Sequence, residues 1–298
     1  MGFNRRLWLG MGALTLLVLA GRTAVANDCS TLHAKSPPHT VAVVELYTSE
    51  GCNSCPPADR WLSRTAADPQ RWIPLALHVD YWDGLGWKDP FSRAAFTGRQ
   101  RALGDAAHAS TIYTPEVFVS GHELRRWAAP GDFSRAIEAR NAHPAQAEIA
   151  LDATAAGTQR VILQTRARFA LPPLAAGTEP PVAWIALTQN GLVSRPSGGE
   201  NGGVELHHDH VVREWIGPIR LNGPTTTWQG EIALPAGARP ADVGLAAFIE
   251  RPGDADILQA TAAPLCRCAA RRRPDQLAVS ETGTAPRSGA CSSDRLRA

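Results

Sequence analysis

The pattern of apolar and polar positions changes near the middle of the chain. Up to about residue 143, short apolar runs alternate with segments whose apolar residues recur at helical spacing. The apolar runs are residues 41–47, 73–81 and 116–119, and the helical segments are 58–66, 92–108 and 132–141. The order strand, helix, strand, helix, strand, helix predicts an α/β unit.

From residue 144 onwards helical periodicity nearly disappears. Short runs of alternating polarity follow, separated by Gly and Pro clusters such as Ser197-Gly198-Gly199. Short alternating strands with turn signals between them indicate an all-β, sandwich-like fold. The runs cover residues 147–153, 160–169, 182–189, 205–215, 227–234 and 243–250.

The N-terminus predicts export. Arg5 and Arg6 precede an apolar stretch, residues 7–20, that is shorter than the roughly 20 residues a membrane span needs. Ala24-Val25-Ala26 matches an A-x-A cleavage site, so we interpret residues 1–26 as a signal peptide. Whether export follows the general or the twin-arginine route stays open. We expect a periplasmic or secreted protein with no membrane segment after cleavage.

Charge and cysteine content refine this picture. The formal net charge is +2, but the arginines of the signal and of residues 266–298 leave the body mildly acidic, which argues against nucleic acid as a partner. We expect residues 266–298, rich in Arg, Ser, Ala and Gly, to form a disordered basic tail. In an oxidising compartment disulfides persist. Our first choice is a Cys29–Cys266 disulfide, with Cys268 and Cys291 either paired in the tail or free.

The most informative motif is the pair Cys52 and Cys55, which follows the first apolar run and precedes a helix. Free N–H groups and the helix dipole at such a junction favour the thiolate, which is the nucleophile of disulfide exchange. A structural disulfide and half of a metal site are the alternatives. Pro56 and Pro57 shift the predicted start of the helix, so either cysteine qualifies as the one nearest the dipole.

Thr114-Pro115 opens the third apolar run. A proline fits best at the first residue of a strand, and we expect a cis bond that faces the cysteine pair. The backbone of Thr114 would then pair with an extended peptide. Glu45 is the candidate for a buried carboxylate that takes a proton from the resolving thiol, and Asp80 is the other candidate.

Other polar and aromatic groups carry weaker signals. The aromatic side chains of residues 81–91 either hold a peptide or pack against their own domain. His78 is an acid–base candidate or a core histidine. In His207-His208-Asp209-His210, alternate side chains on a strand face opposite sides, so we expect no metal site there.

A C-x-x-C pair at the first strand-to-helix junction of this element order is typical of thioredoxin-like proteins. We therefore expect an α/β thioredoxin-like domain over residues 27–143, followed by an all-β, sandwich-like domain over residues 144–265.

Residues 48–59, Thr-Ser-Glu-Gly-Cys-Asn-Ser-Cys-Pro-Pro-Ala-Asp, resemble the signature of a family of secreted bacterial proteins. That family is known as domain of unknown function 1223 and is grouped with thioredoxin-like folds. Residues 78–83, 86–91, 113–115, 199–201 and 208–213 also match its pattern. The resemblance covers about residues 40–265. It implies a fold and a compartment, but no reaction.

Together these observations predict an exported thiol–disulfide oxidoreductase that acts on protein thiols or disulfides in the periplasm. Its site residues would be Cys52, Cys55, Thr114, Pro115 and Glu45, with no cofactor and no metal. The alternative is a non-catalytic binding module, or a carrier of a soft metal such as copper, in which the β domain recognises a partner.

Overall fold

A computed structural model describes residues 29–157, 161–175 and 177–266. The expected signal peptide, the expected tail beyond Cys266, Cys268 and Cys291 all lie outside these ranges. Within the ranges described, no helix is both long and apolar enough to cross a membrane.

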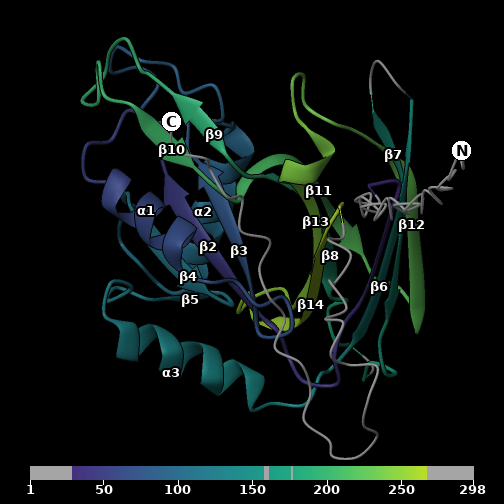
Figure 1. The fold of residues 1–298 in the computed structure, drawn as a ribbon. Helices are drawn as coiled ribbons and strands as arrows, with labels where there is room; N and C mark the ends of the chain where they lie inside the picture. Colours follow the sequence, from purple (N-terminus) through teal and green to yellow (C-terminus); the bar gives the residue numbers. More distant parts are fainter. Residues whose placement is uncertain (1–28, 158–160, 176, 267–298) are drawn as a thin grey trace, which may run out of the picture.

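One mixed sheet of eight strands organises most of the described chain (Figure 1). In pairing order its strands are β14 (Ile257–Pro264), β13 (Val243–Glu250), β8 (Val182–Gln189), β11 (Val211–Arg220), β3 (Trp72–His78), β2 (Ala42–Thr48), β4 (Glu116–Val119) and β5 (His122–Glu123). β3 runs parallel to β2 and to β11, and the other neighbours are antiparallel. Every residue of β2 and β3 is buried, which explains their continuous apolar sequence.

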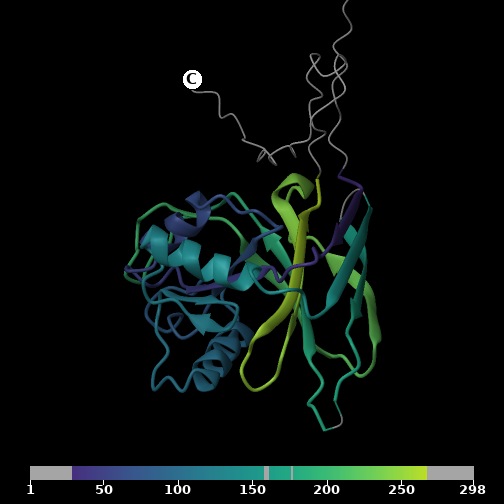
Figure 2. The ribbon, with the colours of Figure 1, turned by 90° about the horizontal axis from the view of Figure 1, so that it is seen from below.

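A second, antiparallel sheet contains β1 (Thr31–Lys35), β6 (Glu148–Ala156), β7 (Ile162–Ala170) and β12 (Thr225–Ala233). Alternate residues of β7 are buried, as expected for a strand with one face in a core. That core joins side chains of the second sheet, such as Leu151 and Phe169, to Ile185 and Ile249 of the first. Figure 2 shows the second sheet and the helices on opposite sides of β13 and β14.

Three α-helices cover the other part of the large sheet. α1 (Pro56–Arg64) and α3 (Pro130–Asn141) pack on the face that carries Val44 and Leu46. α2 (Ala94–Ala106) packs on the opposite face, which carries Val43 and Tyr47. Because side chains alternate along β2, its odd and even residues meet different helices.

The expected fold class, an α/β thioredoxin-like domain followed by a separate all-β domain, is wrong. β11 continues the sheet beyond β3, and the N–H of Ala76 donates to the carbonyl of His210 at 2.9 Å. β1 belongs to the second sheet although it precedes all the helices. Local periodicity located most elements, but it contains no information about which strand edges meet.

The predicted Cys29–Cys266 disulfide is confirmed. It joins a residue two positions before β1 to a residue two positions after β14, at the two ends of the described chain. A cross-link over so long a loop restricts the unfolded chain strongly, since the entropy of loop closure grows with loop length.

A buried ion pair connects the two halves of the large sheet. Arg99 of α2, 4% exposed, donates to both carboxylate oxygens of Glu45 on β2 at 2.6 and 2.8 Å, and to Glu250 on β13 at 2.7 Å. Its guanidinium also lies 5.2–5.5 Å from the ring centroids of Trp184, Trp215 and Phe248. Burial raises the pKa of Glu250, although Arg99 opposes this shift.

We expect Arg99→Met to lower the free energy of unfolding by about 3–5 kcal/mol, because it leaves two buried carboxylates without a cation. Arg101→Met is the matched control, since Arg101 is exposed on the same helix, and it should change stability by less than about 0.5 kcal/mol. Urea denaturation measures both. Equal effects would show that the Arg99 ion pair has no special part in joining the halves.

Candidate active site at the Cys52–Cys55 disulfide

Cys52 and Cys55 form a disulfide between the end of β2 and the start of α1, with their Cα atoms 5.5 Å apart. A tight turn holds them, in which the N–H of Cys55 donates to the carbonyl of Cys52 at 3.2 Å. Both cysteines are fully buried. The Sγ of Cys52 lies 3.2 Å from the hydroxyl of Ser54, whose side chain belongs to an exposed residue. The buried Cys52 sulfur is therefore in contact with a residue that solvent reaches.

Thr114 and Pro115 lie beside the pair, as predicted, and their peptide bond is cis. The carbonyl oxygen of Thr114 is 3.9 Å from the Sγ of Cys52. The indole N–H of Trp82 donates to the Thr114 hydroxyl at 2.8 Å. Gln100 donates to the carbonyl of Tyr113 at 2.7 Å, so the two residues before Pro115 are each held by a hydrogen bond.

Glu116, directly after Pro115, is buried and accepts a hydrogen bond from Gln100 at 2.6 Å. Burial raises the pKa of Glu116 to about 7, and the Gln100 bond opposes that shift. A cavity of about 290 Å³ lies next to this segment, lined by Tyr113, Glu123 and Arg125 among others. The segment around Pro115 thus has a buried carboxyl on one side and a small hollow beside Tyr113.

The start of α1 answers the question of which cysteine lies nearest the helix. Cys55 is the N-cap residue, and Pro56 and Pro57 form the first turn. The N–H groups of Ala58 and Asp59 both donate to the Cys55 carbonyl, at 2.8 and 3.1 Å. Cys55 rather than Cys52 is adjacent to the helix, and the free N–H groups expected there are missing.

The structure does not bring Glu45 to the cysteine pair. Glu45 lies on the α2 face of β2, where it pairs with Arg99 and accepts the hydroxyl of Tyr47 at 2.8 Å. α1 covers the opposite face. The other candidate, Asp80, accepts a hydrogen bond from the Thr97 hydroxyl at 2.5 Å.

A carboxylate that we had not assigned a role, Asp59, lies behind Cys55. It follows Cys55 by one helical turn, so the two side chains share a face of α1, and both are buried. Desolvation by burial raises the pKa of Asp59, while the nearby imidazoles of His208 and His78 oppose the shift. The helical i, i+4 spacing is the sequence signal that identifies Asp59.

Two buried histidine–carboxylate pairs surround this acid. His78 contacts Asp89 at 2.7 Å and His208 contacts Glu50 at 3.2 Å, with the two imidazole rings 5.1 Å apart. Burial works to lower the pKa of His78, but the Asp89 carboxylate outweighs it, so that pKa is raised. The Nε2 of His78 and the Nδ1 of His208 make no hydrogen bond within the described residues. A buried, titratable cluster therefore backs the disulfide.

A loop between β9 (Leu192–Ser194) and β10 (Leu206–His208) closes the site from the C-terminal half. The side-chain amide of Asn201 donates to the carbonyls of Glu50 and Cys52, both at 2.9 Å. The Glu200 carboxylate accepts the N–H of Asn53 at 2.9 Å. A side-chain carbon at Gly198 would lie 2.2 Å from the carbonyl oxygen of Gly86, so only glycine fits where the two loops meet.

Comparison with known proteins agrees with these motifs. The family described as "Protein of unknown function (DUF1223)" matches residues 43–250. The chain belongs to the DUF1223 family. A search of curated proteins finds no match.

Two solved structures resemble this DUF1223 chain. A crystal structure of a protein from Agrobacterium tumefaciens is 22% identical, with a TM-score of 0.56 over 80% of this chain and 100% of the other. HBP35 of Porphyromonas gingivalis is 18% identical, with a TM-score of 0.60 over 84% of this chain and 81% of the other. At these identities the likeness concerns the fold alone.

Most aromatic residues of the 81–91 loop of this DUF1223 chain are engaged within the molecule. Trp82 bonds Thr114, the Trp87 indole donates to Glu50 at 2.8 Å, and Phe91 packs against the His78 and His208 rings. Tyr81 is 36% exposed and remains at the surface.

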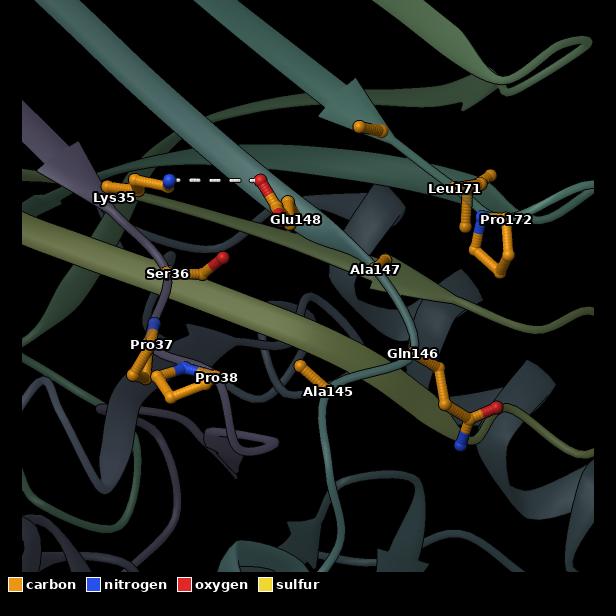
Figure 3. Close-up of a pocket in the computed structure, with 11 residues that line it drawn as sticks. Lys35, Ser36, Pro37, Pro38, Ala145, Gln146, Ala147, Glu148, Leu171 and Pro172 are labelled. Carbon is orange, nitrogen blue, oxygen red and sulfur yellow. Dashed lines mark ion pairs between the residues drawn. The ribbon is translucent and has the colours of Figure 1, made fainter.

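The histidine cluster at residues 207–210 is divided between different surroundings. His207 is exposed beside Glu205, whereas His208 is buried against Glu50. Over the described ranges, no three His, Cys, Asp or Glu residues are arranged to hold a metal ion. A cavity of about 600 Å³ lies on the second sheet, at the ends of β1, β6 and β7, where Lys35 and Glu148 pair at 3.8 Å (Figure 3). None of the residues that line this cavity belongs to the surroundings of the Cys52–Cys55 pair described above.

Proposed function

We propose that this DUF1223 chain is an exported thiol–disulfide oxidoreductase that acts on protein thiols or disulfides through Cys52 and Cys55. The contact of 3.9 Å between the Cys52 sulfur and the Thr114 carbonyl carries the proposal. It combines an exchangeable sulfur with backbone groups of Thr114 that can pair with an extended peptide. Export rests on the signal sequence, and the disulfides are consistent with an oxidising compartment.

In the proposed reaction the Cys52 thiolate attacks a sulfur of a partner disulfide. A mixed disulfide forms and the other partner sulfur leaves as a thiolate. Cys55 then attacks the Cys52 sulfur, releases the second partner thiolate and closes the Cys52–Cys55 bond. Two electrons and the two protons of the protein thiols pass to the partner, and the reverse sequence oxidises a partner dithiol.

Cys52 is the attacking residue in this proposal because its sulfur touches the exposed Ser54 and the Thr114 carbonyl. Cys55 is the N-cap residue of α1, and no contact of its sulfur with an exposed residue is seen among the described residues. Since both cysteines are buried in the disulfide form, a partner has to displace the Ser54 side chain to reach Cys52.

Asp59 replaces Glu45 as the residue that we propose takes the proton of the Cys55 thiol. Its place one turn after Cys55, on the buried face of α1, supports this role. The carboxylate and imidazoles that act on it are those of Asp89, His78 and His208, and His208 is in turn paired with Glu50.

The second candidate is a non-catalytic binding module in which the pair is structural. The complete burial of both cysteines favours it. In that case the loop that holds Asn201 would serve only to fix the 50–55 turn.

Cys52→Ser should abolish exchange with insulin or oxidised glutathione, and Cys55→Ser should accumulate mixed disulfides on Cys52, because no resolving thiol remains. Mass spectrometry of the trapped adducts measures this. As a control, the double variant Cys29→Ser/Cys266→Ser should keep exchange while losing about 2–5 kcal/mol of stability. If both single variants behave like the wild type, the binding-module interpretation is correct.

Asp59→Asn should slow the resolving step by about 100-fold at pH 8, because the proton acceptor is lost. In the wild type the rate should rise with pH in two steps, as Asp59 ionises and as the thiols ionise, and the variant should keep only the thiol step. Because the pKa of Asp59 is raised in the folded protein, this carboxyl costs stability as pH rises above its unfolded-state pKa, and the full cost is present above the folded-state pKa; the variant should therefore unfold no more easily than the wild type at pH 8. Stopped-flow exchange over pH 5–9, with Asp105→Asn as the exposed control, tests the role; parallel pH profiles would refute it.

A further inference from the structure

The surroundings of the cysteine pair offer few groups that stabilise a thiolate. The first N–H groups of a helix are normally free to bind an anion. In α1 these positions are Pro56 and Pro57, which have no N–H. The next two N–H groups, of Ala58 and Asp59, are bonded to the Cys55 carbonyl. The helix therefore presents no amide donor to either sulfur.

Carboxylates near the cysteine pair also disfavour a thiolate. The Glu200 carboxylate takes the N–H of Asn53, which lies between the two cysteines. Asp59 lies buried one turn behind Cys55. The two buried histidines of the cluster are each paired with another carboxylate, Asp89 or Glu50. A Cys52 thiolate that forms before Asp59 takes the Cys55 proton would face this negative charge, which disfavours the thiolate relative to the disulfide.

One donor does contact the pair, the hydroxyl of Ser54 at 3.2 Å from the Cys52 sulfur. The same hydroxyl is 3.4 Å from the Thr114 carbonyl, to which it donates. A hydroxyl carries a single hydrogen, so these two bonds compete. Ser54 thus offsets only part of the missing stabilisation.

We propose that the Cys52–Cys55 pair is a reductant whose dithiol form transfers two electrons to disulfide bonds of partner proteins. The inference rests on the proposed exchange function and gives it a direction. A C-x-x-C protein is a strong oxidant when its reduced form is well stabilised, and this site lacks that stabilisation. In each cycle the partner disulfide is reduced to a dithiol, the pair becomes a disulfide, and a dithiol electron donor reduces the pair again.

The test measures the thiol–disulfide equilibrium of the full-length protein in defined mixtures of reduced and oxidised glutathione or dithiothreitol. The readout is the fraction of Cys52 and Cys55 that is alkylated. The wild type should stay oxidised throughout the glutathione series and become half reduced only with dithiothreitol. Pro56→Ala/Pro57→Ala restores two N–H groups and should shift the equilibrium constant about tenfold toward the dithiol, which is about 30 mV for a two-electron couple.

Glu200→Gln should shift the equilibrium the same way, because it removes a charge and keeps an acceptor for Asn53. Pro130→Ala is the matched control, since Pro130 begins a different helix, α3, which contributes no residue to the surroundings of the pair described above, and it should leave the equilibrium unchanged. Half reduction within the glutathione series, or an unchanged equilibrium in the Pro56/Pro57 variant, would overturn the reductant assignment while exchange itself stands. A folded protein whose pair exchanges with neither reagent would overturn the proposed function.

Discussion

The buried guanidinium of Arg99 is the contact on which the joining of the two halves depends. It binds Glu45 from the N-terminal half and Glu250 from the C-terminal half within a cage of aromatic rings. A buried ion pair need not add much net stability, but its geometry tolerates only one arrangement of charges, since any unpaired member is costly. The sheet that contains β2 and β13 is thereby fixed around α2.

This arrangement also determines what the cysteine pair encounters. Side chains alternate along β2, so Glu45 lies on the α2 face with Arg99, whereas α1, whose N-cap is Cys55, covers the opposite face. Some of the groups that surround the pair come from the C-terminal half: Asn201 and Glu200 hold the turn, and His208 pairs with Glu50. Neither half contains the complete site alone.

The sequence predicted the local elements well, for physical reasons that are easy to state. Continuous apolar runs marked β2 and β3, and the C-x-x-C and Thr-Pro motifs located two segments that do meet. The Cys29–Cys266 disulfide was also predicted correctly. The pairing of β11 with β3 could not be predicted, because an exposed backbone edge has no side-chain signature of its own.

Glu45 and Asp59 show which parts of the candidate site local sequence patterns can and cannot predict. The interpretation of Glu45 depended on which helix covers which face of β2, and that is a long-range property. Asp59 needed only the helical spacing from Cys55, which was present in the sequence. The partnership of His208 with Glu50 joins positions far apart in the chain and became evident only from the fold.

The described chain contains two disulfides, and we assign them different tasks: Cys52–Cys55 is proposed to exchange, and Cys29–Cys266 to be structural. Alkylation mass spectrometry of the folded protein, before and after a mild dithiol reductant, compares them directly. We predict that the reductant exposes Cys52 and Cys55 to labelling, while Cys29 and Cys266 stay protected until the chain is denatured. A Cys52–Cys55 bond that resists the reductant as fully as Cys29–Cys266 would contradict it.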